Sequence, residues 1–150
     1  MLINQDMEVF FCREGYLRTC GFEYSLDNCQ DNKIHLTNNA VQKNANNYGQ
    51  FEDGNMLNFD QLQEVIDTHH NPILAKLGKP PVSVRDDIVE DIKFVVAKTM
   101  DSVKRKLDPN KRNGCFELFG YDFMVDNDLT VWLIEVNTNP CLETSSRLLG

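Results

Sequence analysis

The sequence of 150 residues lacks the features that mark several common classes of protein. No apolar stretch approaches the roughly 20 residues that a membrane-spanning helix needs. No secretory signal is recognisable at the start, because Asn4, Gln5, Asp6 and Glu8 interrupt it. No Asn-x-Ser/Thr site for N-glycosylation occurs. The sequence therefore predicts a cytoplasmic protein with no membrane partner.

Cysteine is too scarce and too irregularly spaced to build a framework. The five cysteines form no C-x-x-C pair, and their number is odd. This pattern argues against both a disulfide-stabilised fold and a structural zinc site, so we expect reduced thiols. Cys141 has no readable base to activate it as a nucleophile, and we interpret it as a small apolar filler.

Basic charge is also scarce. The chain has 15 Lys and Arg residues against 23 Asp and Glu residues, which gives a net charge of −8. Such a balance argues against nucleic acid, which requires a basic face. The main cluster of cations is interpreted as a solvated helix end, although it could also steer an acidic substrate towards the protein. Its members are Lys98, Lys104, Arg105, Lys106, Lys111 and Arg112.

Hydrophobic periodicity indicates one domain of the α/β (α+β) class, with a mainly antiparallel sheet and packed helices. Residues 59–70 are predicted to be a helix, after which Pro72 and the run Gly78-Lys79-Pro80-Pro81 break the chain. Ser83 is predicted to cap a longer helix that ends at Asp108. A helix is also expected over residues 145–149. Residues 1–11 resemble the tail of one strand, residues 8–13 and 16–19 are predicted to form a short hairpin, and residues 21–58 are predicted to be mostly loop.

The most informative segment is residues 115–140. Two apolar runs flank the polar Asp126-Asn127-Asp128, which predicts two antiparallel strands joined by a tight turn. Asp122, Glu135 and Asn137 interrupt these runs. A buried carboxylate is costly when it is unpaired, so a bound cation would offset the cost.

The register decides whether these three side chains can meet. If residues 126–129 form the turn, Asp122 lies opposite Leu133 and Gly120 lies opposite Glu135, where it would leave room for a ligand. Asp122, Glu135 and Asn137 then share one face of the hairpin. Their oxygen atoms suit Mg²⁺. A solvated face that carries an Asp and a Glu would give the same pattern, and a change of one residue in the turn would separate the three side chains. Phe116, Phe119, Phe123 and Trp132 are predicted to be core residues.

Several strings of residues also carry a resemblance. The segment FELFGYDFMVD followed by VWLIEVNTNP closely resembles the C-terminal signature of the tubulin tyrosine ligase and tubulin tyrosine ligase-like family. Two upstream blocks match the family in the same order, CREGYLRTC at residues 12–20 and HLTNNAVQK at residues 35–43. The string NYGQFEDGN at residues 47–55 is similar to a family segment as well.

The resemblance implies an ATP-grasp fold and an ATP-dependent ligase. In this family ATP phosphorylates a protein carboxylate, and the amine of a free amino acid (tyrosine, glutamate or glycine) then attacks the acyl-phosphate, mostly on tubulin. The implied cofactors are ATP and Mg²⁺, with Asp122, Glu135 and Asn137 as the metal ligands and Glu135 as a catalytic residue. The implied partners are tubulin or microtubules, and the implied location is the cytoskeleton, including the cilium or basal body.

Further residues take roles from the same resemblance. Arg18 matches an arginine near the incoming amino acid and the acyl-phosphate. Thr37 and Asn38 match a pair that contacts the nucleotide, and Asn39 and Lys43 are counted with them. Without the resemblance, Arg18 would be a surface arginine, Thr37 and Asn38 a loop or cap pair, and Lys43 an exposed lysine at the edge of a polar loop.

The sequence departs from the family pattern in two places. Glutamate-adding members often carry Tyr-Ser where this chain has Asn39-Ala40, so the resemblance does not imply glutamate. No segment before Cys12 matches the front lobe that clasps ATP, which predicts that residues 1–150 are the C-terminal lobe of a longer enzyme. Two alternatives stay open. The chain could be a non-catalytic remnant that binds tubulin or a partner, or an ATP-grasp ligase for a small molecule.

Overall fold

The computed structural model describes residues 1–140, and these residues form two compact units. The first unit comprises residues 1–13 and 66–140, and the second comprises residues 14–65. Antiparallel strands and helices occur in both, so the predicted α+β class is confirmed. The interpretation of Cys141 and the helix predicted over residues 145–149 lie outside the described residues.

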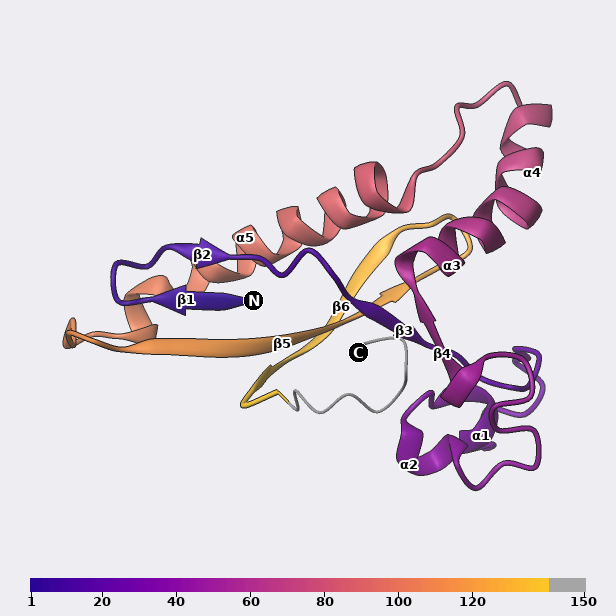
Figure 1. Ribbon diagram of the computed structural model, residues 1–150, viewed down its shortest axis with the longest axis horizontal. Helices are drawn as coiled ribbons and strands as arrows, with labels where there is room; N and C mark the ends of the chain where they lie inside the picture. The colour runs from indigo at the N-terminus through magenta and orange to yellow at the C-terminus, as the bar shows by residue number, and fades with distance from the viewer. Residues whose placement is uncertain (141–150) are drawn as a thin grey trace. The chain divides into compact units, whose positions relative to one another are not determined.

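The first unit is built on a four-stranded antiparallel sheet with the strand order β2-β1-β5-β6 (Figure 1). Its strands are β1 (Leu2–Asn4), β2 (Val9–Phe10), β5 (Phe116–Val125) and β6 (Val131–Thr138). Its helical segments are η2 (Ile66–His70), α4 (Asn71–Lys76), η3 (Val84–Ile88) and α5 (Val89–Leu107). The prediction of a single strand in residues 1–11 is wrong, because a turn at residues 5–8 folds β2 back onto β1.

The predicted hairpin between residues 8–13 and 16–19 is also wrong. β2 pairs with β1, whereas β3 (Tyr16–Arg18) pairs with β4 (Met56–Asn58) in the second unit. The boundary between the two units falls between Arg13 and Glu14, at the position where the hairpin turn was expected. Two short strands that follow each other closely in the chain had other partners available, and adjacency in sequence was a poor guide to pairing.

Helix α5 covers one face of the sheet, as its apolar stripe predicted (Figure 1). Met100 packs with Ile3 and Phe119 in a buried cluster, and the Thr99 hydroxyl lies 2.8 Å from the Tyr121 hydroxyl. The predicted cap is confirmed: the Ser83 hydroxyl accepts a hydrogen bond from the Asp86 backbone N–H. The packing fixes which face of β5 is buried against the helix and which face is left for other contacts.

The helix predicted over residues 59–70 is confirmed, but it continues through η2 and α4 to Lys76. Pro72 does not interrupt it, because Pro72 lies in the first turn of α4, where the absent N–H would have no helical partner. The break predicted at the Gly78-Lys79-Pro80-Pro81 run is confirmed, because the helix ends at Lys76 and the chain turns at Gly78, whose φ of +67° favours glycine.

The β5–β6 hairpin has a different register from the expected one. Val125 pairs with Val131, so the turn is one residue longer than predicted. A β-bulge follows, because Phe123 pairs with Leu133 whereas Asp122 pairs with Glu135. Ile134 is the extra residue. The longer turn alone would have turned Glu135 to the opposite face from Asp122, and the bulge restores the shared face.

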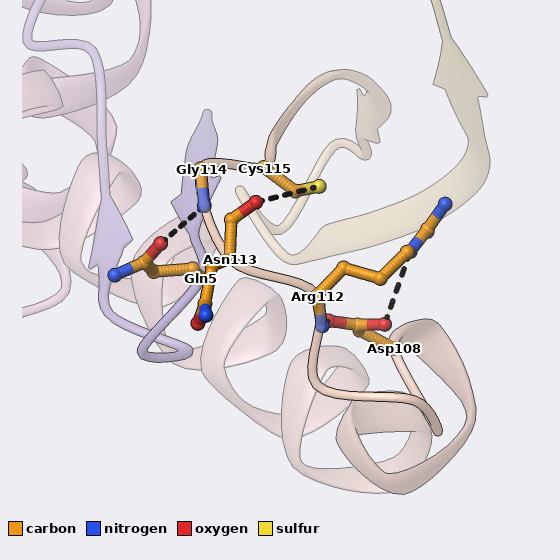
Figure 2. A network of polar contacts seen from close by, with 6 residues as sticks. All are labelled: Gln5, Asp108, Arg112, Asn113, Gly114 and Cys115. Carbon is orange, nitrogen blue, oxygen red and sulfur yellow. Dashed lines mark hydrogen bonds and ion pairs between the residues drawn. The ribbon is translucent and has the colours of Figure 1, made fainter.

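The start of β5 is fixed by contacts with the turn between β1 and β2 (Figure 2). The Gly114 backbone N–H donates a hydrogen bond to the Gln5 side-chain oxygen. On the same connection, the Arg112 backbone N–H donates to Asp108 at the end of α5. These contacts lock both ends of the segment that joins α5 to β5, and they support the pairing of β5 with β1.

The second unit contains few regular elements. They are β3, α1 (Asn32–His35), α2 (Asn39–Gln42), η1 (Asp53–Asn55), β4 and α3 (Phe59–Val65). Residues 21–58 are therefore mainly turns and very short helices, as predicted, and β3–β4 is a two-stranded sheet. Among residues 1–140, no helix is both long and apolar enough to cross a membrane.

Candidate functional site

Three polar side chains meet on the β5–β6 hairpin. The Asn137 amide nitrogen donates hydrogen bonds to Asp122 Oδ2 at 3.3 Å and to Glu135 Oε1 at 3.1 Å. Asp122 lies directly opposite Glu135, and Gly120 lies opposite Asn137. The expected pairings of Asp122 with Leu133 and of Gly120 with Glu135 are therefore wrong. The expected meeting of the three side chains on one face is nonetheless present.

These carboxylates are not buried. Asp122, Glu135 and Asn137 are all exposed, on the face of the hairpin opposite the one that α5 covers. The argument that a cation must offset the cost of a buried carboxylate is therefore wrong, because water can solvate these groups. What remains is a cluster of oxygen donors around one amide, and this arrangement is compatible both with a solvated face and with an ion site.

The absent side chain of Gly120 makes room for a different neighbour from the ligand that was predicted. A Cβ atom at this position would lie 2.9 Å from the Cβ of Pro140, which is closer than side chains tolerate. The absent side chain thus makes room for Pro140, not for a ligand opposite Glu135. The close approach brings the chain after β6 back onto the centre of β5.

The donor set fits a hard divalent cation. Both carboxylates present oxygen, and a 180° rotation of the Asn137 side-chain amide would replace its nitrogen with oxygen in nearly the same position. Mg²⁺ usually takes one or two carboxylates and keeps several waters, which suits an exposed position. No group of three or more His, Cys, Asp or Glu side chains that could hold a metal occurs within residues 1–140. The set has two carboxylates, and the amide would be its third protein ligand.

Large apolar side chains flank the polar set along the same face. Met124 pairs with Trp132, and both are more than half exposed, as is Phe116. The prediction that Phe116 and Trp132 are core residues is therefore wrong, whereas Phe119 is buried. Trp132 donates its indole N–H to Asp126 Oδ2 at 2.8 Å. That bond and the backbone N–H groups of the turn lower the pKa of Asp126.

Arg18 lies at the end of β3, opposite Met56. Its guanidinium stacks on the Tyr16 ring, 5.3 Å from the ring centre, and an N–H lies 3.4 Å from the Tyr16 hydroxyl. Tyr16 and Arg18 share one face of the strand because they are two residues apart.

The residues predicted to contact nucleotide lie in and beside α2: Thr37 and Asn38 precede it, Asn39 is its first residue, and Lys43 follows it. Thr37 and Asn38 are exposed, and their side chains have no hydrogen-bond partner among the described residues. Asn39 differs, since its side-chain oxygen accepts a hydrogen bond from the Tyr48 hydroxyl at 2.7 Å. Lys43 caps the C-terminus of α2 and is exposed. Within this segment, Thr37 and Asn38 are therefore available for a ligand, whereas Asn39 is occupied.

Two buried amides beside this segment escaped the sequence reasoning. Gln42 is 0% exposed and Asn55 is 4% exposed, and their side chains are the buried polar groups of the described chain. Gln42 donates to the backbone carbonyls of Lys33 and Leu36, on the side of α1 that leads to Thr37. No sequence signal distinguished Gln42 from the many exposed Asn and Gln residues around it.

Comparison with known proteins gives a consistent result. The model of the tubulin-tyrosine ligase family matches residues 1–149. A probable tubulin polyglutamylase of Mus musculus, TTLL9, is 29% identical over 94% of this chain and 28% of its own length. Tubulin glycylase 3D of Tetrahymena thermophila is 34% identical over 95% of this chain and 13% of its own length.

A probable tubulin polyglutamylase of Caenorhabditis elegans, ttll-9, is 35% identical over 90% of this chain and 29% of its own length. The chain therefore spans less than a third of the length of these relatives. Their names divide between two added amino acids, glutamate and glycine.

Proposed function

Because the chain belongs to the tubulin-tyrosine ligase family, we propose that it is part of the catalytic domain of a ligase that joins an amino acid to tubulin at the expense of ATP. The residues 1–140 would form the C-terminal lobe of that domain. The γ-phosphoryl group of ATP would pass to a carboxylate of the tubulin substrate, and the amine of the free amino acid would then displace phosphate to form the amide. The observation that carries the proposal is the meeting of Asp122, Glu135 and Asn137 on one strand pair.

In this proposal Asp122, Glu135 and Asn137 hold Mg²⁺. The bound ion would neutralise negative charge on phosphate oxygens. Two carboxylates on adjacent strands repel each other in the absence of a cation, and the Asn137 amide shares its two protons between them. The hairpin geometry supports this role because the backbone ladder fixes both carboxylates at directly opposite positions.

In the second unit, Thr37 and Asn38 would contact the nucleotide and Arg18 would bind the acyl-phosphate or the carboxylate of the amino acid. The Thr37 hydroxyl and the Asn38 amide have no hydrogen-bond partner among residues 1–140, which supports the first role. A planar guanidinium held over an aromatic ring supports the second, because its fork of donors stays oriented. Asn39 would act through Tyr48 rather than by direct contact, and Lys43 would lend positive charge nearby.

The relatives' names agree on tubulin as the acceptor but differ in the amino acid that is added. Tubulin or microtubules are the proposed partner, and the cytoskeleton is the proposed location. Asn39-Ala40 departs from the Tyr-Ser of glutamate-adding members, so tyrosine, glutamate and glycine all stay as candidate amino acids.

The test is the Glu135→Gln substitution in the complete protein, assayed with purified tubulin, ATP, Mg²⁺ and each radiolabelled amino acid. Removal of one ligand charge should lower the ligation rate by about 100-fold or more. Because Glu135 is exposed, the hairpin should stay folded, which circular dichroism and thermal unfolding would verify. Glu117→Gln is the matched control, because Glu117 is an exposed glutamate of β5 outside the polar set.

Three outcomes would count against the proposal. Full ligation by the Glu135→Gln variant would remove Glu135 from the metal site. An equal loss in the Glu117→Gln control would show that the effect is not specific to the set. Absence of ligation by the wild-type protein with every amino acid and tubulin form would favour a non-catalytic remnant.

A further inference from the structure

We infer that Gln42 is a positioning residue, whose buried side-chain amide holds the backbone of the loop that presents Thr37 and Asn38. This inference rests on the proposed function, because the loop matters only if its side chains contact a nucleotide. Gln42 itself cannot touch a ligand, since its side chain has no exposed surface.

The side-chain amide of Gln42 forms hydrogen bonds with the backbone just before the loop. Gln42 Nε2 donates to the Leu36 carbonyl at 2.6 Å and to the Lys33 carbonyl at 3.0 Å. Leu36 directly precedes Thr37, and Lys33 lies within α1. Both protons of the amide are therefore used on the backbone of one short stretch, and the geometry fixes the direction in which the chain leaves α1.

The backbone of Gln42 closes the other end of the loop. The N–H groups of Gln42 and Val41 donate to the Asn38 carbonyl at 3.0 and 2.9 Å. Asn38 is thus held by its carbonyl, whereas its side chain makes no capping hydrogen bond. One residue bounds the pair Thr37–Asn38 on both sides, and both residues of the pair are exposed.

The same hydrogen-bond network reaches the end of β3, the strand that contains Arg18. Asn55 Nδ2 lies 3.5 Å from Gln42 Oε1 and 3.4 Å from the Thr19 carbonyl, and the Thr19 backbone N–H donates to the Asn55 carbonyl at 2.9 Å. Thr19 follows Arg18 at the end of β3. Through these contacts the proposed nucleotide loop and the proposed acyl-phosphate residue share one buried support within the second unit.

Loss of the Gln42 amide would release this support without altering any proposed contact residue. The Leu36 carbonyl would lose its donor, and the Lys33 carbonyl would keep only the Cys20 thiol. A partly buried carbonyl without a donor is costly, so the loop would leave the observed geometry for one that reaches water. Only the fraction of molecules with the correct loop would then bind nucleotide well, and the apparent affinity for ATP would fall by that fraction. Once ATP is bound, the reacting groups are unchanged.

The test compares Gln42→Met, which keeps the length of the side chain but has no N–H donor, with Gln50→Met as the matched control. Gln50 is an exposed glutamine of the same unit, and its side chain has no hydrogen bond to another described residue. Two quantities are measured in the complete protein: steady-state ligation kinetics at varied ATP, and backbone hydrogen exchange over residues 33–42.

We expect Gln42→Met to raise the KM for ATP by roughly tenfold with little change in kcat, because the competent loop becomes a minor population. Hydrogen exchange should accelerate in residues 36–42 and stay unchanged in β5 and β6. The control should alter neither quantity. A residue that served stability alone would lower the melting temperature without this split between KM and kcat.

The outcomes separate this inference from the proposed function. Unchanged exchange and unchanged KM in Gln42→Met would overturn the positioning role while the ligase activity of the wild type stood. If exchange accelerated but the wild type neither bound ATP nor ligated, the proposed function would fail and take the role of Gln42 with it. If Gln42→Met did not fold, hydrogen exchange of the Gln42 side-chain amide would be measured in the wild type. Slow exchange would support the inference, and fast exchange would contradict it.

Discussion

The two compact units hold their candidate residues by different physical means. In the first unit, Asp122 and Glu135 are carried on paired strands, and a helix packs against the opposite face of the sheet. In the second unit, Thr37 and Asn38 lie on a loop that two buried side-chain amides support, those of Gln42 and Asn55. Apolar packing with a backbone ladder tolerates exposed polar residues, whereas a loop needs specific polar partners in its interior.

The largest expected effect concerns the apolar core of the first unit. Phe119→Ala would remove a buried ring that packs on Ile3 and Met100, and we expect a loss of about 3–5 kcal/mol in the free energy of unfolding. Denaturant unfolding followed by circular dichroism measures the loss. Phe116→Ala is the control on the same strand, because its ring is 70% exposed and its removal should change stability by less than about 0.5 kcal/mol. Similar losses in both variants would contradict the packing described for α5.

The next effect concerns the polar support of the second unit. Asn55→Gly would remove the buried amide and still permit the φ of +54° that Asn55 adopts, so backbone strain is avoided. We expect a loss of about 1–3 kcal/mol, because the Gly49 N–H and the Gln42 side chain each lose a partner. Hydrogen exchange at Gly49 should accelerate at the same time. A variant as stable as the wild type, with Gly49 still protected, would show that the amides are dispensable.

The smallest effect is a pH dependence in the turn of the first unit. The Trp132 indole and the Thr130 N–H stabilise ionised Asp126, which lowers its pKa below the ordinary value. A lowered folded pKa means that the stabilisation is complete above the ordinary carboxyl pKa and disappears as the pH falls through the lower folded value. Trp132 is the single tryptophan of the chain, so its fluorescence reports the change directly. A midpoint at or above the ordinary pKa, or an unchanged acid transition in Asp126→Asn, would contradict this contact.

The difference between the units also explains what the sequence could predict. Helix α5 and the β5–β6 hairpin follow from periodic patterns of apolar residues, and Ser83 marks the helix start by its chemistry. The pairing of β1 with β2 and of β3 with β4 could not be predicted, since each strand has only two or three residues and carries almost no pattern. The effect of Pro72 was predicted wrongly, because the sequence does not distinguish a proline in the first turn of a helix from a proline in a loop.

The candidate site divides in the same way. The alternation of side chains along the strands correctly brought Asp122, Glu135 and Asn137 together, although both the turn length and the register differed from the prediction. Two deviations of one residue cancelled, which no pattern in the sequence signals. The predicted burial of the carboxylates was wrong, whereas the alternative of a solvated face agrees with their exposure. The sequence does not reveal how exposed each face of the hairpin is. Gln42 was missed since its burial depends on partners many residues away.

Because of the bulge, the effect of deleting one residue from β6 depends on which residue is deleted. If Ile134 were excised, Leu133 and Glu135 would become neighbours, and an uninterrupted ladder would still set Glu135 against Asp122. If Val136 were excised instead, Asn137 would move opposite Tyr121 and its amide would turn towards α5. Two cuts of equal size, two positions apart, would thus spare the cluster in one case and dismantle it in the other.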